Sequence, residues 1–433
     1  MARAKKETAL TPEERLQAAL VPDWEWPYKL PENWCWLKLV ESFDNHTDSK
    51  KKIKQKDYLV KGKLAVVDQG QELIGGYTND VEKSYSGALP IVIFGDHTRC
   101  IKFVDFPFAQ GADGVKVLRP KPFYLPKAFY YALQSVNIPN LGYRRHFPLF
   151  NKFSIPLPPF AEQQRIVDRI ESLFAKLDEA KEKAQAVVDS FETRKAAILH
   201  KAFTGELTAK WREEHDVRMD SWKVRTLDSV CSSIFDGDHM PPPKAESGIP
   251  FLVISNVNTG HLTFENTRFV PQEYYDTLSD TRKPQLGDVL YTLVGSFGIP
   301  VVVNSKRPFC FQRHMALLRP IDVSPQFLWY ILQTPEMYDK ASSIATWTAQ
   351  LTVPIKGLRA MTIPRPNIAE QIEIVRILDG FFAREQSAKE AAEAVLDQIN
   401  LMKKSILARA FRGELGTNDP SEESAVELLK QII

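Results

Sequence analysis

The sequence repeats itself at an offset of 208 residues. Residues 155–163 and 363–371 share the pattern I-P-x-P-x-x-A-E-Q, and both copies continue without a gap to the shared ending I-L-x-x-A-F-x-G-E-L. Between residues 155–207 and 363–415, 25 of 53 aligned positions are identical. An internal repeat of this kind predicts a chain built from two copies of one structural unit.

Both copies carry apolar residues at alternating four- and three-residue steps, which is the a/d pattern of a coiled coil. Arg194 interrupts the first apolar seam and Glu385 interrupts the second. The first seam contains Ile166, Ile170, Leu173, Leu177, Ala180, Ala184, Val187, Phe191 and Ile198. The second seam contains Ile374, Leu378, Phe381, Ala388, Ala392, Val395, Ile399, Met402 and Ile406.

Each seam lies between prolines and a glycine, Gly205 or Gly413, placed where a left-handed C-terminal cap is expected. Each helix should therefore span about 40 residues, or about 60 Å. Because the two seams match position for position, we expect the helices to pair with each other. The alternative is that each helix packs only on its own domain.

The repeat divides the chain into alternating globular and helical segments. Strand-like runs such as 91–94 and 289–294, separated by Gly, Asp and Asn turns, predict twisted sheets in both globular parts. A capping box at Thr11–Glu14 predicts a short first helix, and an antiparallel pair of long helices would bring the last helix back to it. The predicted segments are an N-terminal helical segment (1–29), domain 1 (30–158), spacer helix 1 (159–208), domain 2 (209–366), spacer helix 2 (367–415) and a C-terminal tail helix (416–433).

The predicted fold class is therefore α+β. Two α/β domains with twisted sheets are separated by two long antiparallel coiled-coil helices, in a pseudo-two-fold circular arrangement.

Catalytic motifs are missing from the sequence. It contains no nucleotide-binding glycine loop, no H-E-x-x-H and no G-x-S-x-G. At 157–160, L-P-P-F has leucine where an amino-methyltransferase needs Asp, Asn or Ser, and a nuclease's Pro-Asp and Glu-x-Lys pairs occur only far apart. We expect a non-catalytic protein; a stand-alone methyltransferase or nuclease with unrecognised motifs and a coiled-coil scaffold remain alternatives.

Metal ligands and membrane segments are not indicated either. Cys35, Cys100, Cys231 and Cys310 form no C-x-x-C pair, so we expect isolated buried thiols. The D-G-D-H at 236–239 is typical of a turn, with metal binding as the less favoured alternative. We expect no metal and no cofactor on this chain. Because no long apolar run is present and the start is polar, a cytoplasmic protein is expected.

Positive charge is local. The net charge is only +2, but seven lysines and one acid, Asp57, lie between Lys50 and Lys63, and domain 1 sums to +6. Basic and aromatic residues together suggest contacts to DNA phosphates and bases, and arginine can bond a guanine edge at two points. An exposed, solvated surface residue is the alternative at each position. The predicted contacts are Lys50, Lys51, Lys52, Lys54, Arg99, Tyr143, Arg144 and Arg145 in domain 1, and Asp238, His239, Ser296, Phe297, Arg313 and Trp347 in domain 2.

The paired motifs, each following a divergent globular region, resemble the specificity subunits of type I restriction-modification systems. Domain 2 also resembles a common target-recognition type through residues 236–239, 248–252 and 287–290, whereas domain 1 departs from that type at 104–108 and 111–114. The resemblance implies two target-recognition domains that read different halves of a bipartite, asymmetric DNA site.

The resemblance also implies partners. Each spacer helix would dock one modification subunit, which holds S-adenosylmethionine and methylates adenine N6, and restriction subunits would supply ATP- and Mg²⁺-dependent translocation and cleavage. The expected partners are thus double-stranded DNA, two modification subunits and restriction subunits, with no membrane. A rigid helical spacer would fix the number of unread base pairs between the half-sites.

Overall fold

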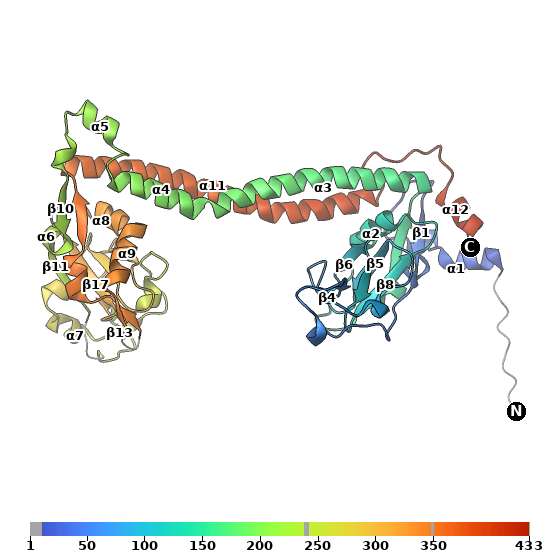
Figure 1. Cartoon of the computed structure of the whole chain (residues 1–433), viewed down its shortest axis with the longest axis horizontal. Helices are drawn as coiled ribbons and strands as arrows, with labels where there is room; N and C mark the ends of the chain where they lie inside the picture. The colour runs from blue at the N-terminus through green and yellow to red at the C-terminus, as the bar shows by residue number, and fades with distance from the viewer. Residues whose placement is uncertain (1–10, 238–241, 348–349, 433) are drawn as a thin grey trace. The chain divides into compact units, whose positions relative to one another are not determined.

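A computed structural model of the chain describes residues 11–237, 242–347 and 350–432 (Figure 1). The chain divides into two compact units: unit 1 comprises residues 1–184 and 394–433, and unit 2 comprises residues 185–393. Both boundaries fall inside long helices. Each unit therefore contains one sheet-rich domain and a stretch of each long helix.

The long helices are α3 (Phe160–Asp189), α4 (Phe191–Phe203) and α11 (Ile368–Ala410). The first predicted helix is thus interrupted at Ser190, whose hydroxyl donates back to the carbonyls of Ala186 and Val187. A serine hydroxyl that competes for helical carbonyls in this way commonly bends a helix. Gly205 (φ 85°) and Gly413 (φ 75°) adopt the left-handed conformation predicted for the ends of the two helices.

The helices pair antiparallel in each unit. In unit 1, Ile166 and Ile170 of α3 share a core with Leu407 and Ala410 of α11, and Lys403 is paired with Asp178 further along α3. In unit 2, Lys389 lies 4.9 Å above the ring of Phe191, and Arg194 is paired with Glu385. Residue numbers fall along α11 as they rise along its partner, so the predicted mutual pairing of the helices is confirmed.

The predicted seams hold in part. Ile166, Ile170, Ala184, Ile374, Leu378, Ala392 and Ile399 are buried, and Leu173, Leu177, Val187, Phe191 and Phe381 are partly buried. Ala388, Val395 and Met402, however, are exposed, the last two by 41% and 46%. Leu396 and Lys403, the neighbours of Val395 and Met402, are partly buried instead.

Lysine 403 explains the error in the second seam. Its ammonium group lies 5.0 Å from the ring centroid of Phe174 and 2.5 Å from the carboxylate of Asp178. A lysine can bury its aliphatic stem in a helix interface while its charge finds a partner. The apolar pattern alone therefore favoured the adjacent Met402, which lies outside the seam.

In unit 1, α2 covers the larger sheet, and Phe94 and Leu118 of the sheet share a core with Phe129 and Leu133 of α2. The larger sheet has the order β2-β8-β5-β6, a second sheet has the order β4-β3-β7 with β3 and β7 parallel, and β1 pairs with β9. The elements are α1 (Pro12–Ala19), α2 (Pro126–Ser135), α12 (Ala425–Ile432), β1 (Cys35–Lys38), β2 (Phe43–Asn45), β3 (Leu64–Val67), β4 (Gly76–Thr78), β5 (Ile91–Gly95), β6 (Ile101–Val104), β7 (Phe108–Gln110), β8 (Val115–Pro120) and β9 (Ser154–Leu157).

The two terminal helices, α1 and α12, meet in unit 1. The predicted capping box is present, since the Thr11 hydroxyl accepts from the Glu14 N–H and the Glu14 carboxylate accepts from the Thr11 N–H. Helix α1 packs against α12, which confirms the expected contact between the two terminal helices.

In unit 2, α8 covers the corresponding sheet, where Tyr291 and Leu318 share a core with Phe327 and Ile331. The sheets have the orders β11-β17-β14-β15, β13-β12-β16, β10-β20 and β18-β19. The elements are α5 (Ala209–Glu214), α6 (Leu227–Val230), α7 (Gln272–Thr277), α8 (Pro325–Leu332), α9 (Pro335–Ile344), α10 (Ile355–Ala360), β10 (Lys223–Thr226), β11 (Cys231–Asp236), β12 (Ile249–Leu252), β13 (Arg268–Val270), β14 (Val289–Thr292), β15 (Pro300–Val302), β16 (Cys310–Phe311), β17 (Met315–Pro320), β18 (Thr346–Trp347), β19 (Leu351–Thr352) and β20 (Thr362–Arg365).

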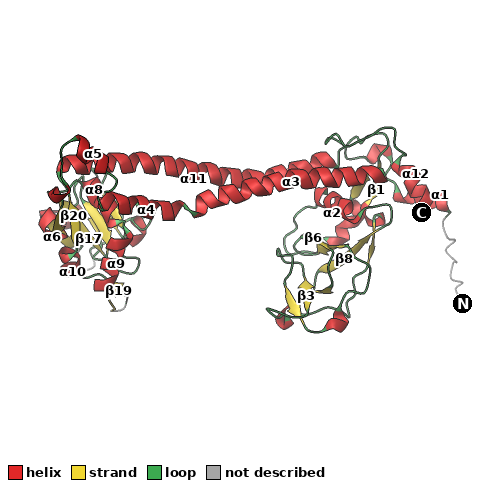
Figure 2. Cartoon of the chain, turned by 45° about the horizontal axis from the view of Figure 1, so that its top comes forward, coloured by secondary structure: helices red, strands yellow, loops and turns green. Residues whose placement is uncertain are grey.

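The two domains have the same topology although their sequences diverge. Strands β2, β8, β5 and β6 correspond in order to β11, β17, β14 and β15, and the parallel pair β3–β7 corresponds to β12–β16. In each unit the sheets lie beside the long helices (Figure 2). The repeat seen in the helices therefore extends to the architecture of the domains.

The Glu-Gln of the repeated motif fixes each domain to its long helix. Glu162 and Glu370 have fully buried carboxylates, which accept from the indole N–H of Trp34 (2.6 Å) and Trp222 (2.8 Å), respectively. The next residues, Gln163 and Gln371, are also buried and accept from the backbone N–H at the N-cap of α2 (2.7 Å) and of α8 (2.9 Å). These four bonds, which we call the tethers, explain why Glu and Gln recur.

The segment that follows each long helix covers one of these glutamates. In unit 1, Thr417 and Asn418 donate to Glu162 at 3.1 and 2.9 Å. In unit 2, Thr208 and Arg212 donate to Glu370 at 2.7 and 2.6 Å. Both buried carboxylates therefore have several donors, as burial of a charged group requires.

Candidate nucleic-acid interface

Each domain has a cavity with charged side chains in its lining. The lysine pocket of unit 1 has a volume of about 840 Å³, and the Arg313 pocket of unit 2 has a volume of about 610 Å³. The lysine pocket is lined by Ser49, Lys50, Lys52, Lys54, Gln55, Lys56, Tyr58, Asp68, Gln69, Gly70, Thr98, Ala112, Asp113 and Tyr143. The Arg313 pocket is lined by Asp236, Leu293, Val294, Arg313, His314, Gln350, Thr352, Val353, Pro354 and Ile355.

The two pockets occupy the same place in the two domains. The first strand of the larger sheet contributes in both: Ser49 and Lys50 follow β2, and Asp236 ends β11. Each pocket is also lined from the residues after the third strand in sheet order (β5 or β14) and from the turn that precedes the second (β8 or β17). Each also takes residues from the connection between the helix that covers the sheet and the strand before the long helix. The same architecture thus presents two cavities with different side chains.

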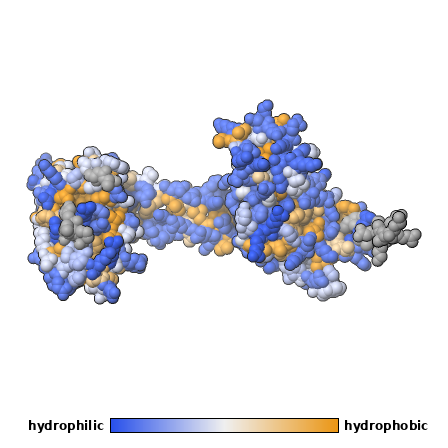
Figure 3. All heavy atoms as spheres, turned by 90° about the horizontal axis from the view of Figure 1, so that it is seen from below, coloured by the Kyte–Doolittle hydropathy of each residue, from blue (hydrophilic) through white to orange (hydrophobic). Residues whose placement is uncertain are grey.

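Lysines dominate the pocket of unit 1. Lys50 and Lys54 are exposed, Lys52 is partly buried, and a neighbouring cavity of about 380 Å³ is lined by Lys52, Lys54, Lys56 and Lys83. Lys51 is directed elsewhere, because its ammonium group donates to the carbonyl of Ser84 at 3.2 Å. The face of unit 1 seen in Figure 3 is largely hydrophilic. Clustered ammonium groups of this kind can bind successive phosphates of a nucleic acid backbone.

A fixed loop presents the predicted aromatic residue of domain 1. Tyr143 is 84% exposed and its ring stacks on His97, with the ring centroids 4.9 Å apart. His146 holds the loop: its buried ring accepts from the Leu141 N–H at 3.1 Å and donates to the Asp96 carbonyl at 2.9 Å. The side chain of Tyr143 is therefore exposed on an ordered loop.

The three predicted arginines of domain 1 have different surroundings. Arg99 has φ 60° and donates to the carbonyl of Ile138 at 2.9 Å, so part of its guanidinium serves the fold. Arg145 lies 4.0 Å from the carboxylate of Asp96, and Arg144 is exposed.

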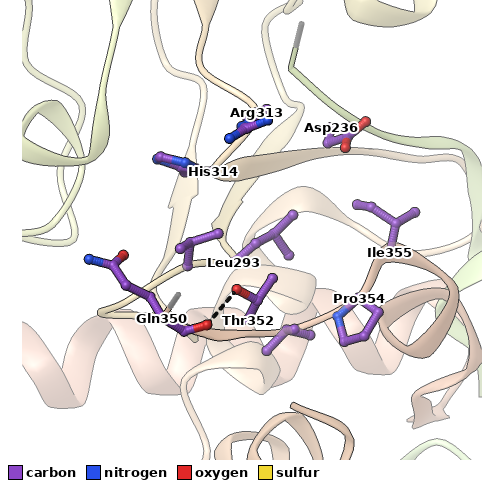
Figure 4. Close-up of a pocket in the computed structure, with 10 residues that line it drawn as sticks. Asp236, Leu293, Arg313, His314, Gln350, Thr352, Pro354 and Ile355 are labelled. Carbon is purple, nitrogen blue, oxygen red and sulfur yellow. Dashed lines mark hydrogen bonds between the residues drawn. The ribbon is translucent and has the colours of Figure 1, made fainter. Parts of the chain in front are cut away.

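In unit 2, Arg313 and His314 lie on one side of the Arg313 pocket, and Gln350, Thr352 and Pro354 lie on the opposite side (Figure 4). Arg313 is exposed and His314 is partly buried. Burial, and then the positive charge of Arg313, lowers the pKa of His314 below its ordinary value. A neutral imidazole offers one donor and one acceptor, and a guanidinium offers donors only, so together they can match the edge of a base pair.

The remaining predicted contacts of domain 2 differ in exposure. Trp347 is 78% exposed on β18, and Ser296 is exposed after β14. Phe297 is only 7% exposed and stacks on Tyr338 at 5.3 Å, so its ring belongs to the domain core. Asp238 and His239 lie outside the described residues.

Sequence reasoning did not single out Tyr58, Gln69 or Gln350, which also line the pockets. Gln69 lies two residues after β3, whereas Tyr58 and Gln350 lie in segments for which the sequence predicts no strand. The pocket position of these residues becomes visible only when the strands of the two domains are matched.

The described residues contain no group of three or more His, Cys, Asp or Glu side chains that could hold a metal ion. Cys35 and Cys231 are buried thiols, and burial raises the pKa of each to about 12. No helix in the described part of the chain has the length and apolar character that a membrane span requires.

Known proteins are similar to this chain over most of its length. The specificity subunit of the type I restriction enzyme EcoKI from Escherichia coli K12 is 28% identical over 305 residues, which cover 65% of this chain and 64% of that protein. The EcoBI specificity subunit from Escherichia coli is 28% identical over 304 residues, which cover 64% of this chain and 63% of that protein. The matches therefore span a little under two thirds of these relatives.

Two solved structures share the fold. The HsdS subunit from Thermoanaerobacter tengcongensis is 21% identical with a TM-score of 0.58, covering 90% of this chain and 99% of that one. A chain from a structural study of complex assembly and conformational transition of the type I R-M system is 21% identical with a TM-score of 0.63, covering 90% and 100%. The predicted fold class of two sheet-rich domains with long helices is confirmed.

The family model for the type I restriction modification DNA specificity domain matches twice, at residues 31–188 and 219–396. Each match begins at the start of a domain and ends within the long helix that follows it. The chain therefore belongs to the type I restriction-modification specificity family, as the repeated motif indicated.

Proposed function

We propose that this chain recognises a bipartite, asymmetric sequence in double-stranded DNA, with one half-site read in each domain. The observation that carries the proposal is the pair of pockets at equivalent positions with different linings. Equivalent positions would give both domains the same approach to a duplex. Different side chains would give them different sequence preferences.

The different side chains of the two pockets suggest different contacts with DNA. The lysine pocket would bind mainly phosphates, which position a protein on DNA without reading sequence. The Arg313 pocket would read a base edge, for which arginine and a neutral histidine are suited. Arg144, which is exposed and follows the pocket residue Tyr143 in sequence, would supply the corresponding base contact in domain 1.

We also propose that the long helices space the two domains and dock two modification subunits, on which restriction subunits assemble. Apolar side chains exposed on α11 support the docking surface: Ile368 is 46% exposed, Ile372 60%, Leu401 65% and Met402 46%. Exposed apolar groups along a helix favour binding of a partner. S-adenosylmethionine, ATP and Mg²⁺ would then belong to these partners, and this chain would be non-catalytic.

Methylation mapping of host DNA tests the recognition proposal. A split, asymmetric motif with one methylated adenine in each half is expected, and its loss on deletion of this gene is required. Specific retardation of a duplex with that motif by the reconstituted complex is also expected. A scaffold without DNA contacts would give no retardation, and methyl transfer by the isolated chain would show a stand-alone enzyme instead.

Matched insertions test the spacer proposal. One heptad inserted after Ala184, together with one after Ala392, adds about 10 Å to the helix pair and preserves both seams. The unread gap should grow by about three base pairs, given about 3.4 Å per base pair, while both half-sites stay the same. A change of the half-sites at constant gap would contradict a spacer role.

A further inference from the structure

Each domain exposes one large aromatic side chain on a segment that contributes residues to its pocket. Tyr143 is 84% exposed in domain 1 and Trp347 is 78% exposed in domain 2. Both come from the same place in the repeat, the connection between the helix that covers the sheet and the strand that precedes the long helix. No sequence similarity joins these two segments, so their common feature is the exposed ring.

The segments that carry the two rings are bonded through their backbones to equivalent strand ends. In domain 1, His146 N–H donates to the carbonyl of Asp96, directly after β5, and His97 Nδ1–H donates to the carbonyl of Tyr143 at 3.2 Å. In domain 2, the N–H of Val353 donates to the carbonyl of Leu293, directly after β14, at 2.9 Å. Strand β14 is the counterpart of β5.

The hairpin that carries Trp347 has further support. Trp347 is paired with Leu351 across β18 and β19, and the N–H of Gly295 donates to the carbonyl of Leu351 at 3.1 Å. An aromatic side chain held on an ordered backbone loses little conformational freedom when it binds. The structure therefore presents two exposed rings on backbone segments that are bonded to a sheet. Lys50, Lys52 and Lys54 line the cavity to which the first segment contributes, and Arg313 lines the cavity to which the second contributes.

Exposed rings beside a cationic cavity match the chemistry of nucleic acid more closely than that of a protein partner. Aromatic side chains stack on bases, and side chains inserted between base steps unstack and kink a duplex. Enzymes that modify a base within a duplex must first move it out of the stack, at a cost in stacking and pairing energy.

We propose that Tyr143 and Trp347 each stack on the bases beside the adenine that is methylated in their half-site, and so hold the duplex open for the modification subunit. They are positioning residues, because the methyl transfer takes place on the partner. This inference rests on the proposed function, and it assigns the chain a role in opening the duplex in addition to reading it.

The test uses the complex reconstituted with its modification subunits and a duplex with the mapped motif. 2-Aminopurine replaces the target adenine of one half-site at a time, because its fluorescence rises when the base leaves the stack. An Arg313→Ala variant identifies the half-site of domain 2 by its weakened footprint. Tyr143→Ala should then abolish the fluorescence rise only in the domain 1 half-site, and Trp347→Ala only in the domain 2 half-site.

Methylation of each strand gives a second readout. Each alanine variant should lower the rate at its own adenine about tenfold, the effect of losing one base–aromatic stack. Tyr143→Phe and Trp347→Phe should retain the rate. A duplex in which the target adenine is already mispaired should restore methylation by the alanine variants, whereas loss of an ordinary binding contact would not be restored.

Trp24→Ala is the matched control, because Trp24 is 85% exposed and does not line either pocket. It should leave both readouts unchanged. The inference is overturned if the alanine variants keep the fluorescence rise, if they affect both half-sites equally, or if the mispaired duplex fails to restore the rate. If the wild-type complex does not bind the duplex at all, the proposed function itself has failed.

Discussion

The guanidinium of Arg194 lies 2.7 Å from the carboxylate of Glu385 across the helix pair of unit 2. These are the two charged residues that interrupt the apolar seams predicted from the sequence, and they lie opposite each other. A polar pair within a coiled-coil seam lowers stability but fixes which residues face each other.

Glu385→Leu should destabilise unit 2 by about 1 kcal/mol, because it leaves a partly buried arginine without its partner. The double variant Arg194→Leu/Glu385→Leu should be at least as stable as the original chain. Denaturant unfolding of all four members of the double-mutant cycle measures the coupling. Additive effects of the single variants would show that the pair contributes nothing.

Glu162→Ala should lower the free energy of unfolding of unit 1 by about 3 kcal/mol. The substitution removes the acceptor of the buried Trp34 indole and of the partly buried Thr417 and Asn418, and unsatisfied buried groups are costly. Glu182→Ala, at an exposed position of the same helix, is the control and should change stability by no more than about 0.5 kcal/mol. Equal losses of stability in the two variants would contradict a tethering role for Glu162.

Lys54→Ala should weaken DNA binding similarly for all sequences. It should also reduce the slope of log affinity against log salt concentration by about 0.9, the value for one phosphate contact. Lys210→Ala provides a control, since Lys210 is exposed on α5 and does not line either pocket. Filter-binding titrations over a range of salt concentrations give the slopes, and an unchanged slope for Lys54→Ala would exclude a phosphate contact.

Arg313→Ala should relax the preference for one base pair in one half-site by about 1–3 kcal/mol, with the other half-site unaffected. Binding to a set of single-base variants of the motif measures this. Uniform weakening across the set would instead indicate a phosphate contact.

High pH should unfold the chain through its buried tyrosines. Burial raises the pKa of Tyr28 to about 12 and that of Tyr124 well above its ordinary value. Below about pH 10 these groups are neutral in both the folded and unfolded states. Above it the unfolded chain loses their protons first, so stability should fall as pH rises from about 10 through the raised pKa values. Urea unfolding at a series of pH values checks this, and Tyr124→Phe should reduce the slope.

Much of the fold could be predicted because the long helices are encoded by a local pattern of apolar residues and glycines. The seam spacing predicted the two long helices, and Gly205 and Gly413 predicted where they end. All three signals lie within a few residues of the feature that they predict. The choice of Met402 over Lys403 failed because burial of a lysine stem depends on Phe174 and Asp178, more than two hundred residues away. Periodicity contains no information about such a partner.

The site was harder to predict for the same reason. Exposed Lys54 and buried Phe297 cannot be distinguished by residue type as DNA contacts, and only the stack of Phe297 on Tyr338 shows which ring is in the core. The common position of the two pockets depends on strand order, which the divergent domain sequences do not state.

The tethers join each domain to its long helix through one indole N–H and one backbone N–H at a helix N-cap. The backbone amide imposes no requirement on side-chain identity, and the indole needs only a tryptophan at the start of the domain. The long helix can therefore hold a domain of different sequence, provided that the domain keeps the tryptophan and the helix N-cap that form these bonds. Under the proposed function, exchange of one domain would change one half of the recognition sequence, while the helices and the partners that they bind would stay the same.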